Sequence, residues 1–277
     1  PLIICETAEN HVPNQYLAIF VNKDRSSHLK LEENLQRYIQ SGRAIAIYGD
    51  AQDLLNILKD IVGDATLLIY LDPFGLKGCE FTSIEPYLGR DKRFSTEIII
   101  NMSMPTLHRL ATYKAKRDGK ESDRTRRLNQ RLSEILGGNY WQEIMWSNLP
   151  PDVKERQVVQ EYIELLKKYL PYAGYCPVKQ RPNGRVKYYI IFCSRHPDAL
   201  LLMNDIMYKA YNETLYEITF EGTLFEAFDW KKFVCHEREI EEQILALIRR
   251  NPGISRKECW LEIIKTCLLY TSPSPRD

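Results

Sequence analysis

The sequence predicts an α/β fold in which a parallel sheet carries helices on both faces and finishes in an antiparallel hairpin. From residue 16 to residue 102, short apolar runs alternate with segments of helical periodicity, which is the signature of a parallel sheet. The run Leu67–Leu71 is apolar throughout, as expected for a strand that is buried on both faces. Further on, Tyr175–Arg181 and Arg185–Arg195 are extended runs joined by a turn that contains Asn183-Gly184, a hairpin signal.

The first part of the chain predicts two strand–helix pairs. Tyr16–Val21 is rich in aromatic and β-branched residues and therefore reads as a strand, which Asn22-Lys23-Asp24 ends. Ser26–Gln40 places leucine and isoleucine at roughly helical spacing. Ala44–Tyr48 is a second short strand, and the leucines of Ala51–Val62 share one face of a predicted helix.

The third strand, Leu67–Leu71, precedes a short helix near Thr82–Leu88 and a fourth strand over Glu97–Met102. A polar stretch from Arg109 to Arg131 then leads into a helix that ends near Leu136. This continued alternation extends the parallel sheet.

Helices dominate the rest of the chain outside the hairpin. Pro151–Leu170 is strongly periodic, and Pro197 stands at the favoured first position of a further helix. Arg238–Arg250 is another periodic helix, and Ser255-Arg256-Lys257-Glu258 is a capping box that begins the next. The last two helices suit the start of a helix-turn-helix or winged-helix module, and a plain helical hairpin is the alternative.

Composition limits the class of protein. At 277 residues, the chain suits one large domain or one domain with a small appendage. A net charge of +1 excludes a wholly basic nucleic-acid coat protein, so any such binding requires local patches. No apolar stretch approaches the roughly 20 residues that cross a bilayer. The seven cysteines form no CxxC pair, which predicts no metal site and reduced thiols in a cytoplasmic protein.

Asp72-Pro73-Phe74-Gly75 directly follows the third strand and is the clearest candidate for chemistry. In open α/β sheets, ligands bind at the carboxyl ends of the strands. Asn22, Asp50 and Asn101 also terminate predicted strands, so we expect them to lie along one rim of the sheet with Asp72. The carboxylate of Asp72 can accept a hydrogen bond from a target amine while the ring of Phe74 packs on a flat substrate. The alternative is that Asp72-Pro73 only ends a strand and opens a turn.

The stretch from Arg109 to Arg131 carries nine basic residues against three acidic ones, a formal charge of +6. It follows the fourth strand, so it is expected at the same edge of the sheet as Asp72. Phosphate binding is one interpretation, and a solvated basic helix is the other. The nucleic-acid-binding candidates, including two beside the hairpin turn, are Lys116, Arg117, Arg124, Arg126, Arg127, Arg131, Lys179 and Arg185.

A parallel sheet that ends in an antiparallel hairpin resembles the Rossmann-like sheet of class I S-adenosylmethionine-dependent methyltransferases. Over residues 1 to about 265, the chain also resembles the three-Cys-motif partner protein (TcmP) family, which joins a methyltransferase-like domain to a C-terminal winged-helix segment. The residues that carry this resemblance are Pro1–Ile4, Asp72–Gly75, Phe81–Ile84, His196-Pro197 and Met203–Tyr208. The resemblance implies S-adenosylmethionine as cofactor and a three-Cys-motif protein as partner.

The resemblance also implies an organisation of the chain. Residues 1–234 would form the methyltransferase-like domain and residues 235–266 a partial winged-helix or helix-turn-helix segment. Residues 267–277 resemble translated adapter sequence and offer nothing to bury, so we expect them to be an artefactual tail. The first strand and the glycine-rich cofactor loop are expected upstream of Pro1. That strand would lie between the strands that end at Val21 and Leu71.

Site residues carry over by position. Asn22 or Asp24 would contact the ribose hydroxyls of the cofactor, although Asn22 stands where the family has an acid, and Asp50 would bind the adenine amino group. The alternative for Asp50 is a turn residue before a helix. In amino-methylating enzymes, the carboxylate at the position of Asp72 and the adjacent backbone carbonyl hold the target nitrogen and aim its lone pair at the methyl group.

Departures from the motif leave two functions open. Phe74 and Gly75 stand where the amino-methylating motif has a second proline and an aromatic residue. One hypothesis is a methyltransferase that acts on nucleic acid at a base nitrogen. The other is an inactive methyltransferase-like binding protein that works with the cysteine-motif partner. A different nucleotide-using α/β enzyme is a third interpretation, against which the terminal hairpin argues.

Overall fold

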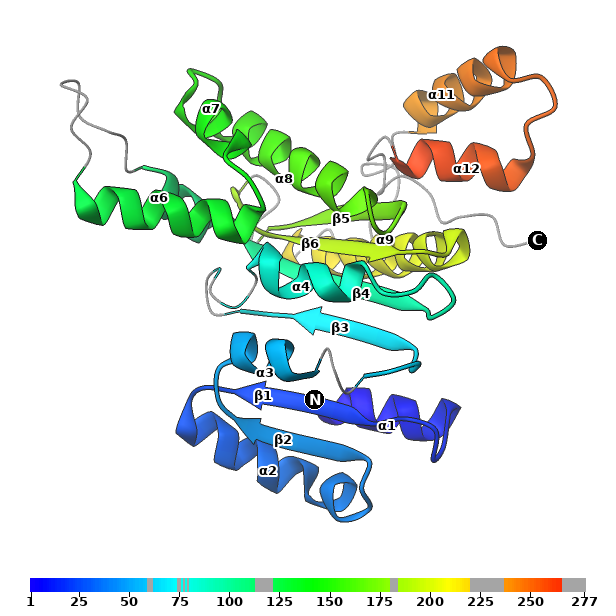
Figure 1. Ribbon diagram of the computed structural model, residues 1–277. Helices are drawn as coiled ribbons and strands as arrows, with labels where there is room; N and C mark the ends of the chain where they lie inside the picture. Colours follow the sequence, from blue (N-terminus) through cyan, green and yellow to red (C-terminus); the bar gives the residue numbers. More distant parts are fainter. Residues whose placement is uncertain are drawn as a thin grey trace. The chain divides into compact units, whose positions relative to one another are not determined.

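A computed structural model describes residues 1–58, 62–73, 76, 78, 80–112, 122–179, 184–219 and 237–265. The described chain is a mixed α/β protein with two separate sheets, whereas the sequence predicts one sheet that holds all the parallel strands (Figure 1). Its contacts divide it into two compact units, residues 1–63 and 64–277, and each is described by itself. The predicted domain over residues 1–234 includes the first unit and much of the second, and its boundary falls outside the described ranges.

The first unit alternates helices and strands, as the sequence predicts. Its elements are α1 (Leu2–His11), β1 (Ala18–Asn22), α2 (Arg25–Gln40), β2 (Ala44–Tyr48) and α3 (Ala51–Leu58). The two strands are parallel, with Ala18 opposite Ala44 and Asn22 opposite Tyr48. Helix α2 packs against both strands. The predicted parallel pairing of these strands is therefore confirmed.

The core of the first unit lies between α1, α2 and the strands. The residues buried together there are Cys5, Leu35, Tyr38 and Ala44. Tyr16 donates a hydrogen bond from its hydroxyl to the carbonyl oxygen of Cys5, at 3.3 Å. This bond ties the body of α1 to the segment that leads into β1.

The second unit contains a four-stranded sheet. Its strands are β3 (Leu67–Leu71), β4 (Thr96–Ser103), β5 (Tyr172–Lys179) and β6 (Val186–Ser194), in the order β3-β4-β6-β5. β3 and β4 are parallel, whereas β6 runs antiparallel to both of its neighbours. Both the parallel pair and the antiparallel hairpin are as predicted, and the turn residues 180–183 lie outside the described ranges.

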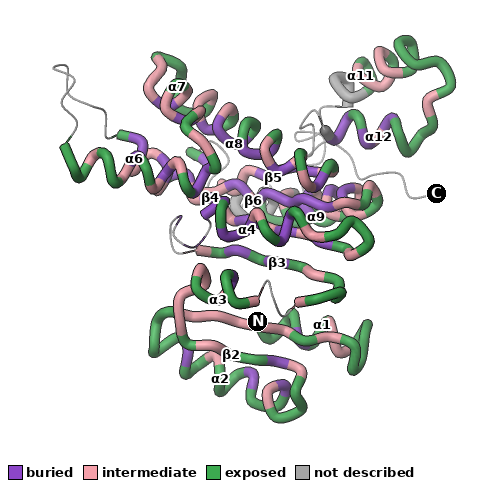
Figure 2. The backbone as a smooth tube through the Cα atoms, viewed as in Figure 1, coloured by how far each residue is buried: buried purple, intermediate pink, exposed green. Residues whose placement is uncertain are grey.

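Helices cover both faces of this sheet. The helices of this unit are α4 (Phe81–Leu88), α5 (Met104–Ala111), α6 (Asp123–Leu136), α7 (Tyr140–Trp146), α8 (Pro151–Lys167), α9 (Pro197–Thr219), α11 (Glu237–Arg250) and α12 (Arg256–Lys265). Helices α5 and α8 pack on β6, and α9 packs on β5 and β6. Figure 2 shows that many residues of β4, β5 and β6 are buried.

Successive side chains of β5 and β6 point to opposite faces of the sheet. Cys176 of β5 and Phe192 of β6 face α9, where they pack with Leu200 and Met207. Leu261 and Ile264 of α12 join the same cluster, so α12 shares the core of α9. The capping box before α12 is confirmed by a 3.2 Å hydrogen bond from the Glu258 amide to the Ser255 hydroxyl.

Two helices differ from the sequence prediction. Helix α5 includes Arg109, which the sequence placed in a polar stretch, because Met104, Leu107 and Ala111 are buried on one face of a helix that follows β4 directly. Helix α7 was not predicted. It spans only seven residues and buries only Trp141 and Met145, which is too short a pattern to show helical periodicity. Tertiary packing decides such short helices more than local periodicity does.

The end of β6 is fastened by Arg195. Its guanidinium donates hydrogen bonds of 2.6–2.8 Å to the backbone carbonyl oxygens of Leu88, Arg90, Asp91 and Phe94. These carbonyls belong to the end of α4 and the loop that leads to β4. Only an arginine fork can donate to so many acceptors at once.

Candidate functional site

The candidate site begins at the carboxyl ends of β3 and β4. The exposed residue Asp72 follows β3, and Asn101 lies on β4. Because Leu71 is paired with Ile100, the next position along each strand brings Asp72 opposite Asn101. The Nδ2 of Asn101 donates a 2.7 Å hydrogen bond to Oδ1 of Asp72. The predicted juxtaposition of these two residues at one edge is therefore confirmed, and the bond fixes the orientation of the carboxylate.

The amide of Asn101 is only half satisfied. Its Oδ1 is buried and accepts no hydrogen bond from the part of the chain that the structure describes. A buried acceptor without a donor is costly, so native proteins rarely leave one without a reason.

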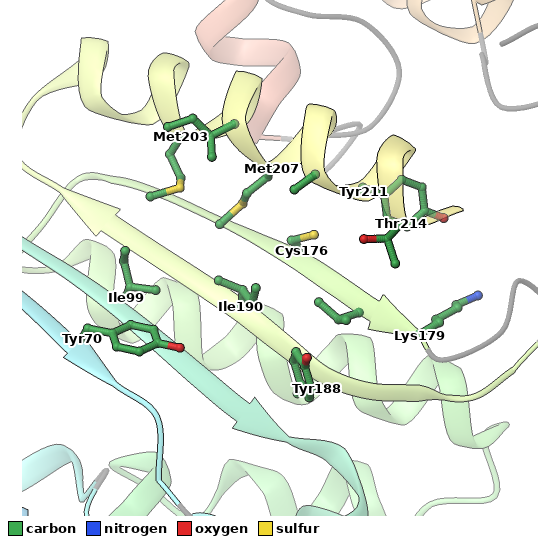
Figure 3. A pocket seen from close by; sticks show the side chains of 13 residues that line it. Tyr70, Ile99, Cys176, Lys179, Tyr188, Ile190, Met203, Met207, Tyr211 and Thr214 are labelled. Carbon is green, nitrogen blue, oxygen red and sulfur yellow. The ribbon is translucent and has the colours of Figure 1, made fainter. Parts of the chain in front are cut away.

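A cavity of about 420 Å³ lies between α9 and the sheet of the second unit (Figure 3). The strand residues that form its floor are cross-strand partners of one another. Asn101 is paired with Ile190, and Ile190 with Cys176, and the last two line the cavity. The Asp72–Asn101 pair therefore stands in the same cross-strand row as the cavity floor.

Tyr70 links the cavity to Asp72. The two residues are two positions apart, so they emerge on the same face of β3, and Tyr70 lines the cavity. Partial burial raises the pKa of the Tyr70 hydroxyl, and the nearby negative charge of Asp72 adds to this effect. The hydroxyl therefore stays protonated at neutral pH and can donate a hydrogen bond.

The other catalytic candidates are only partly visible. Pro73 is half-buried directly after Asp72. Phe74 and Gly75 lie outside the described residues, so the predicted stacking role of Phe74 stays a prediction.

The ribose-contact candidates of the first unit have structural partners. The Oδ1 of Asn22 accepts a 2.9 Å hydrogen bond from the amide of Asp24. The Oδ1 of Asp24 in turn accepts a 2.8 Å bond from the amide of Ser27 and caps α2. Hydrogen bonding from the side chain and the amide of Ser27 lowers the pKa of Asp24 below its ordinary value. A cofactor role for either residue would have to share these oxygens.

Asp50 is also engaged. Its Oδ2 lies 2.9 Å from the Nζ of Lys23, and its Oδ1 accepts a 3.2 Å bond from the amide of Gln52 at the start of α3. The amide of Gly49 donates to the carbonyl of Asn22, so Asn22 and Asp50 follow adjacent strand ends. The predicted rim that would join them to Asp72 spans the two units and stays a prediction.

The basic candidates fall in two places, apart from Lys116 and Arg117, which lie outside the described residues. Arg124, Arg126 and Arg127 are exposed on α6, where Asp123 forms an ion pair with Arg126, and Arg131 is partly buried on the same helix. In Figure 1, α6 extends on the side toward which β3 points. Lys179 and Arg185 flank the hairpin, and Lys179 lines the cavity.

No match to this chain is found among protein-family models, curated proteins or solved structures. Among the described residues, no helix is long and apolar enough to cross a membrane. The same part of the chain gathers no group of three acidic, histidine or cysteine side chains that could hold a metal ion. Only the geometry and chemistry of the site therefore indicate its function.

The sequence placed Asn101 at the rim but missed its role beside Asp72, and it missed the cavity altogether. A polar residue after the apolar run Ile98–Ile100 was the available signal for Asn101. The cavity has no such signal, because tyrosines and methionines at helical or alternating spacing usually belong to a core. Only packing shows that those of α9 and the sheet leave a space between them.

Proposed function

We propose that this chain is an S-adenosylmethionine-dependent methyltransferase-like protein that acts on nucleic acid at a base nitrogen. The observation that carries the proposal is Asp72, held by Asn101 at the carboxyl end of a parallel strand. The sheet order supports the proposal. β3 and β4 are parallel, and β6 lies between β4 and β5 and runs antiparallel to both. This is the antiparallel ending expected of a class I methyltransferase sheet.

Asp72 would act by positioning the acceptor. A carboxylate oriented by Asn101 accepts an N–H of an amine, and the carbonyl oxygen of Asp72 or Pro73 can accept the second. The nitrogen lone pair is then aimed away from both acceptors. Such orientation lowers the activation barrier of methyl transfer, because the entropy of alignment is lost on binding rather than in the reaction step.

The cofactor residues have the right chemistry for S-adenosylmethionine, which supplies the methyl group. Asn22, Asp24 and Asp50 offer acceptor oxygens near the ends of two adjacent parallel strands. A carboxylate oxygen has two lone pairs, so the bonds to Ser27 and Gln52 leave capacity for ribose hydroxyls or an adenine amino group.

The basic surface supports nucleic acid as the substrate. Exposed arginines on α6 and the basic residues beside the hairpin offer contacts to phosphates. Phosphate contacts position a nucleic acid without reading its sequence, so they fit an enzyme whose specificity lies in the base site.

A second candidate is a binding protein without turnover that works with the cysteine-motif partner. The ion pair between Lys23 and Asp50 favours it, because a carboxylate already neutralised by lysine is a weaker ligand for an adenine amino group. Asn22, in place of an acid, points the same way.

Calorimetric titration of the full-length protein with S-adenosylmethionine separates the two candidates. Binding followed by transfer of a labelled methyl group to a base supports the methyltransferase. Nucleic-acid binding with neither cofactor binding nor transfer supports the binding protein and contradicts the enzyme.

A further inference from the structure

We infer that the cavity beneath α9 is a binding site for a small planar aromatic ligand that carries an anionic group. This inference does not depend on methyl transfer, because every residue that carries it lies in the second unit and none is proposed to hold the cofactor. The cavity has a volume of about 420 Å³, which is in the range of small-molecule sites.

The walls of the cavity are mainly apolar. Ile99, Val178 and Ile190 form the floor on β4, β5 and β6, and Met203 and Met207 approach from α9 (Figure 3). An apolar enclosure between a helix and a sheet favours a ligand that buries carbon surface. The body of the ligand is therefore apolar.

The ring and sulfur content of the lining favours an aromatic ligand. Tyr70, Tyr188 and Tyr211 contribute three phenol rings, which pack on planar groups by stacking or edge-to-face contact. Met203 and Met207 add thioethers, whose sulfur atoms make favourable contacts with aromatic rings. An aliphatic chain would use none of these preferences.

Charge at one end selects an anion. Among the described residues that line the cavity, Lys179 has the only formal charge, and no carboxylate is present. Figure 3 shows Lys179, Tyr211 and Thr214 near the same end. Burial raises the pKa of the Tyr211 hydroxyl, so it remains a neutral donor. An anionic group placed there gains charge-assisted hydrogen bonds.

The dimensions suit a ligand of two or three fused or linked rings. Tyr70 lies in the cross-strand row of Gly174, which is three strand spacings from Tyr70 and five residues along β5 from Lys179. These two offsets separate Tyr70 from Lys179 by roughly 20 Å, too far for such a ligand to span. A bicyclic or tricyclic body can instead contact Tyr188 and Tyr211 while its anionic group reaches Lys179.

Two matched fluorescent probes test the site. 8-Anilinonaphthalene-1-sulfonate is an aromatic anion, and N-phenyl-1-naphthylamine is its uncharged counterpart. The protein is expected to bind both at one site, and Lys179→Ala is expected to weaken the sulfonate probe on the order of tenfold while leaving the neutral probe unchanged. Lys209→Ala, at an exposed position of α9 outside the cavity lining, is the charge-matched control and should change neither.

Filling the cavity should block both probes. Ala210→Trp adds bulk at an exposed position that lines the cavity, and Ile206→Trp, which is 52% exposed, does so from the neighbouring turn of α9. Circular dichroism of each variant checks that the fold is kept. Undiminished binding by both folded variants, or equal weakening of both probes by Lys179→Ala, would overturn the inference.

Competition identifies the source of the anion. Adenosine 5′-monophosphate and 2-naphthoate both combine an aromatic group with a negative charge. Displacement of the sulfonate probe by the nucleotide alone supports a nucleotide ligand, and displacement by naphthoate alone supports an aromatic acid. Displacement by neither would overturn the inference.

Discussion

At the scale of single residues, Asp72 is the position on which the proposed chemistry depends. The hydrogen bond from Asn101 fixes its carboxylate, whereas the proposed cofactor residues lie elsewhere in the sequence. Orientation of an acceptor and retention of a cofactor are therefore separable, and substitutions can test them one at a time.

Asp72→Ala is expected to abolish methyl transfer in the full-length protein and to leave S-adenosylmethionine binding nearly intact. Loss of acceptor positioning can cost several kcal/mol of barrier, on the order of a thousandfold in rate. Transfer assays and calorimetry measure the two effects. Asp91→Ala, an exposed aspartate paired with Arg93, is the control and should keep full activity. Robust transfer by Asp72→Ala would show that the active site lies elsewhere.

A second residue-scale prediction concerns the buried carboxylate of Glu155. It is 3% exposed and lies 2.6 Å from Nε2 of His108, which is more accessible. His108→Ala leaves that carboxylate buried without its partner and is expected to lower the free energy of unfolding by about 2–4 kcal/mol.

Urea unfolding of a double-mutant cycle checks this prediction. His108→Ala with Glu155→Leu removes the uncompensated charge together with its partner, so it should recover much of the lost stability. A double variant that is as unstable as the sum of the single ones would contradict the pairing.

At the scale of elements, helix ends show how local chemistry limits each segment. Asp24 caps α2, and Ser255 with Glu258 caps α12 through reciprocal hydrogen bonds. These bonds lower the pKa of Asp24 and of Glu258 because they favour the ionised carboxylate. Each cap therefore contributes stability that depends on pH.

Asp24→Ala is expected to destabilise the first unit at neutral pH and to lose this effect in acid. The folded-state pKa of Asp24 is depressed, so its contribution is complete above the unfolded pKa near 3.8 and declines as pH falls through the folded value. Unfolding followed from neutral pH to below pH 3 measures the trend. Asp24→Asn keeps a capping oxygen without titration and should show a smaller, pH-independent effect. A constant deficit for Asp24→Ala would contradict the assignment.

The arginines of α6 give a second element-scale prediction. Changing Arg124, Arg126 and Arg127 together to Gln is expected to weaken nucleic-acid binding and to flatten its salt dependence, by up to about three units of slope for double-stranded DNA. Binding measured over a series of salt concentrations gives the slope.

The matched control removes the same charge from exposed positions elsewhere, by changing Lys30, Lys92 and Lys209 to Gln. It should leave the slope nearly unchanged if α6 tracks phosphates. Equal losses in the two triple variants would show that only overall charge matters, which would contradict a specific surface on α6.

At the scale of the whole molecule, the chain divides at Gly63 into two compact units. The second unit holds its own sheet, with helices on both faces and a core cluster that includes Phe192, Leu200 and Leu261. Residues 64–265 expressed alone are therefore expected to unfold in one cooperative transition and to retain the cavity beneath α9. Calorimetry and binding of the sulfonate probe test this, and a non-cooperative, probe-free product would contradict it.

Local sequence patterns determined the elements of this protein. The apolar run before Asp72 and the capping box at Ser255 each depend on residues only a few positions apart, so periodicity and capping chemistry predict them. The parallel pairing and the hairpin followed from the order of those elements. The short helices α5 and α7 did not, because burial rather than propensity forms them.

Only the tertiary structure decided the contacts that make a site. Asp72 meets Asn101 across 29 positions of sequence, because the register of β3 on β4 fixes their pairing. The cavity depends on how α9 lies over β5 and β6, and no local pattern encodes the space that remains between packed side chains. Register and packing are collective properties of distant segments, so the sequence names the residues of the site while the fold determines which of them meet.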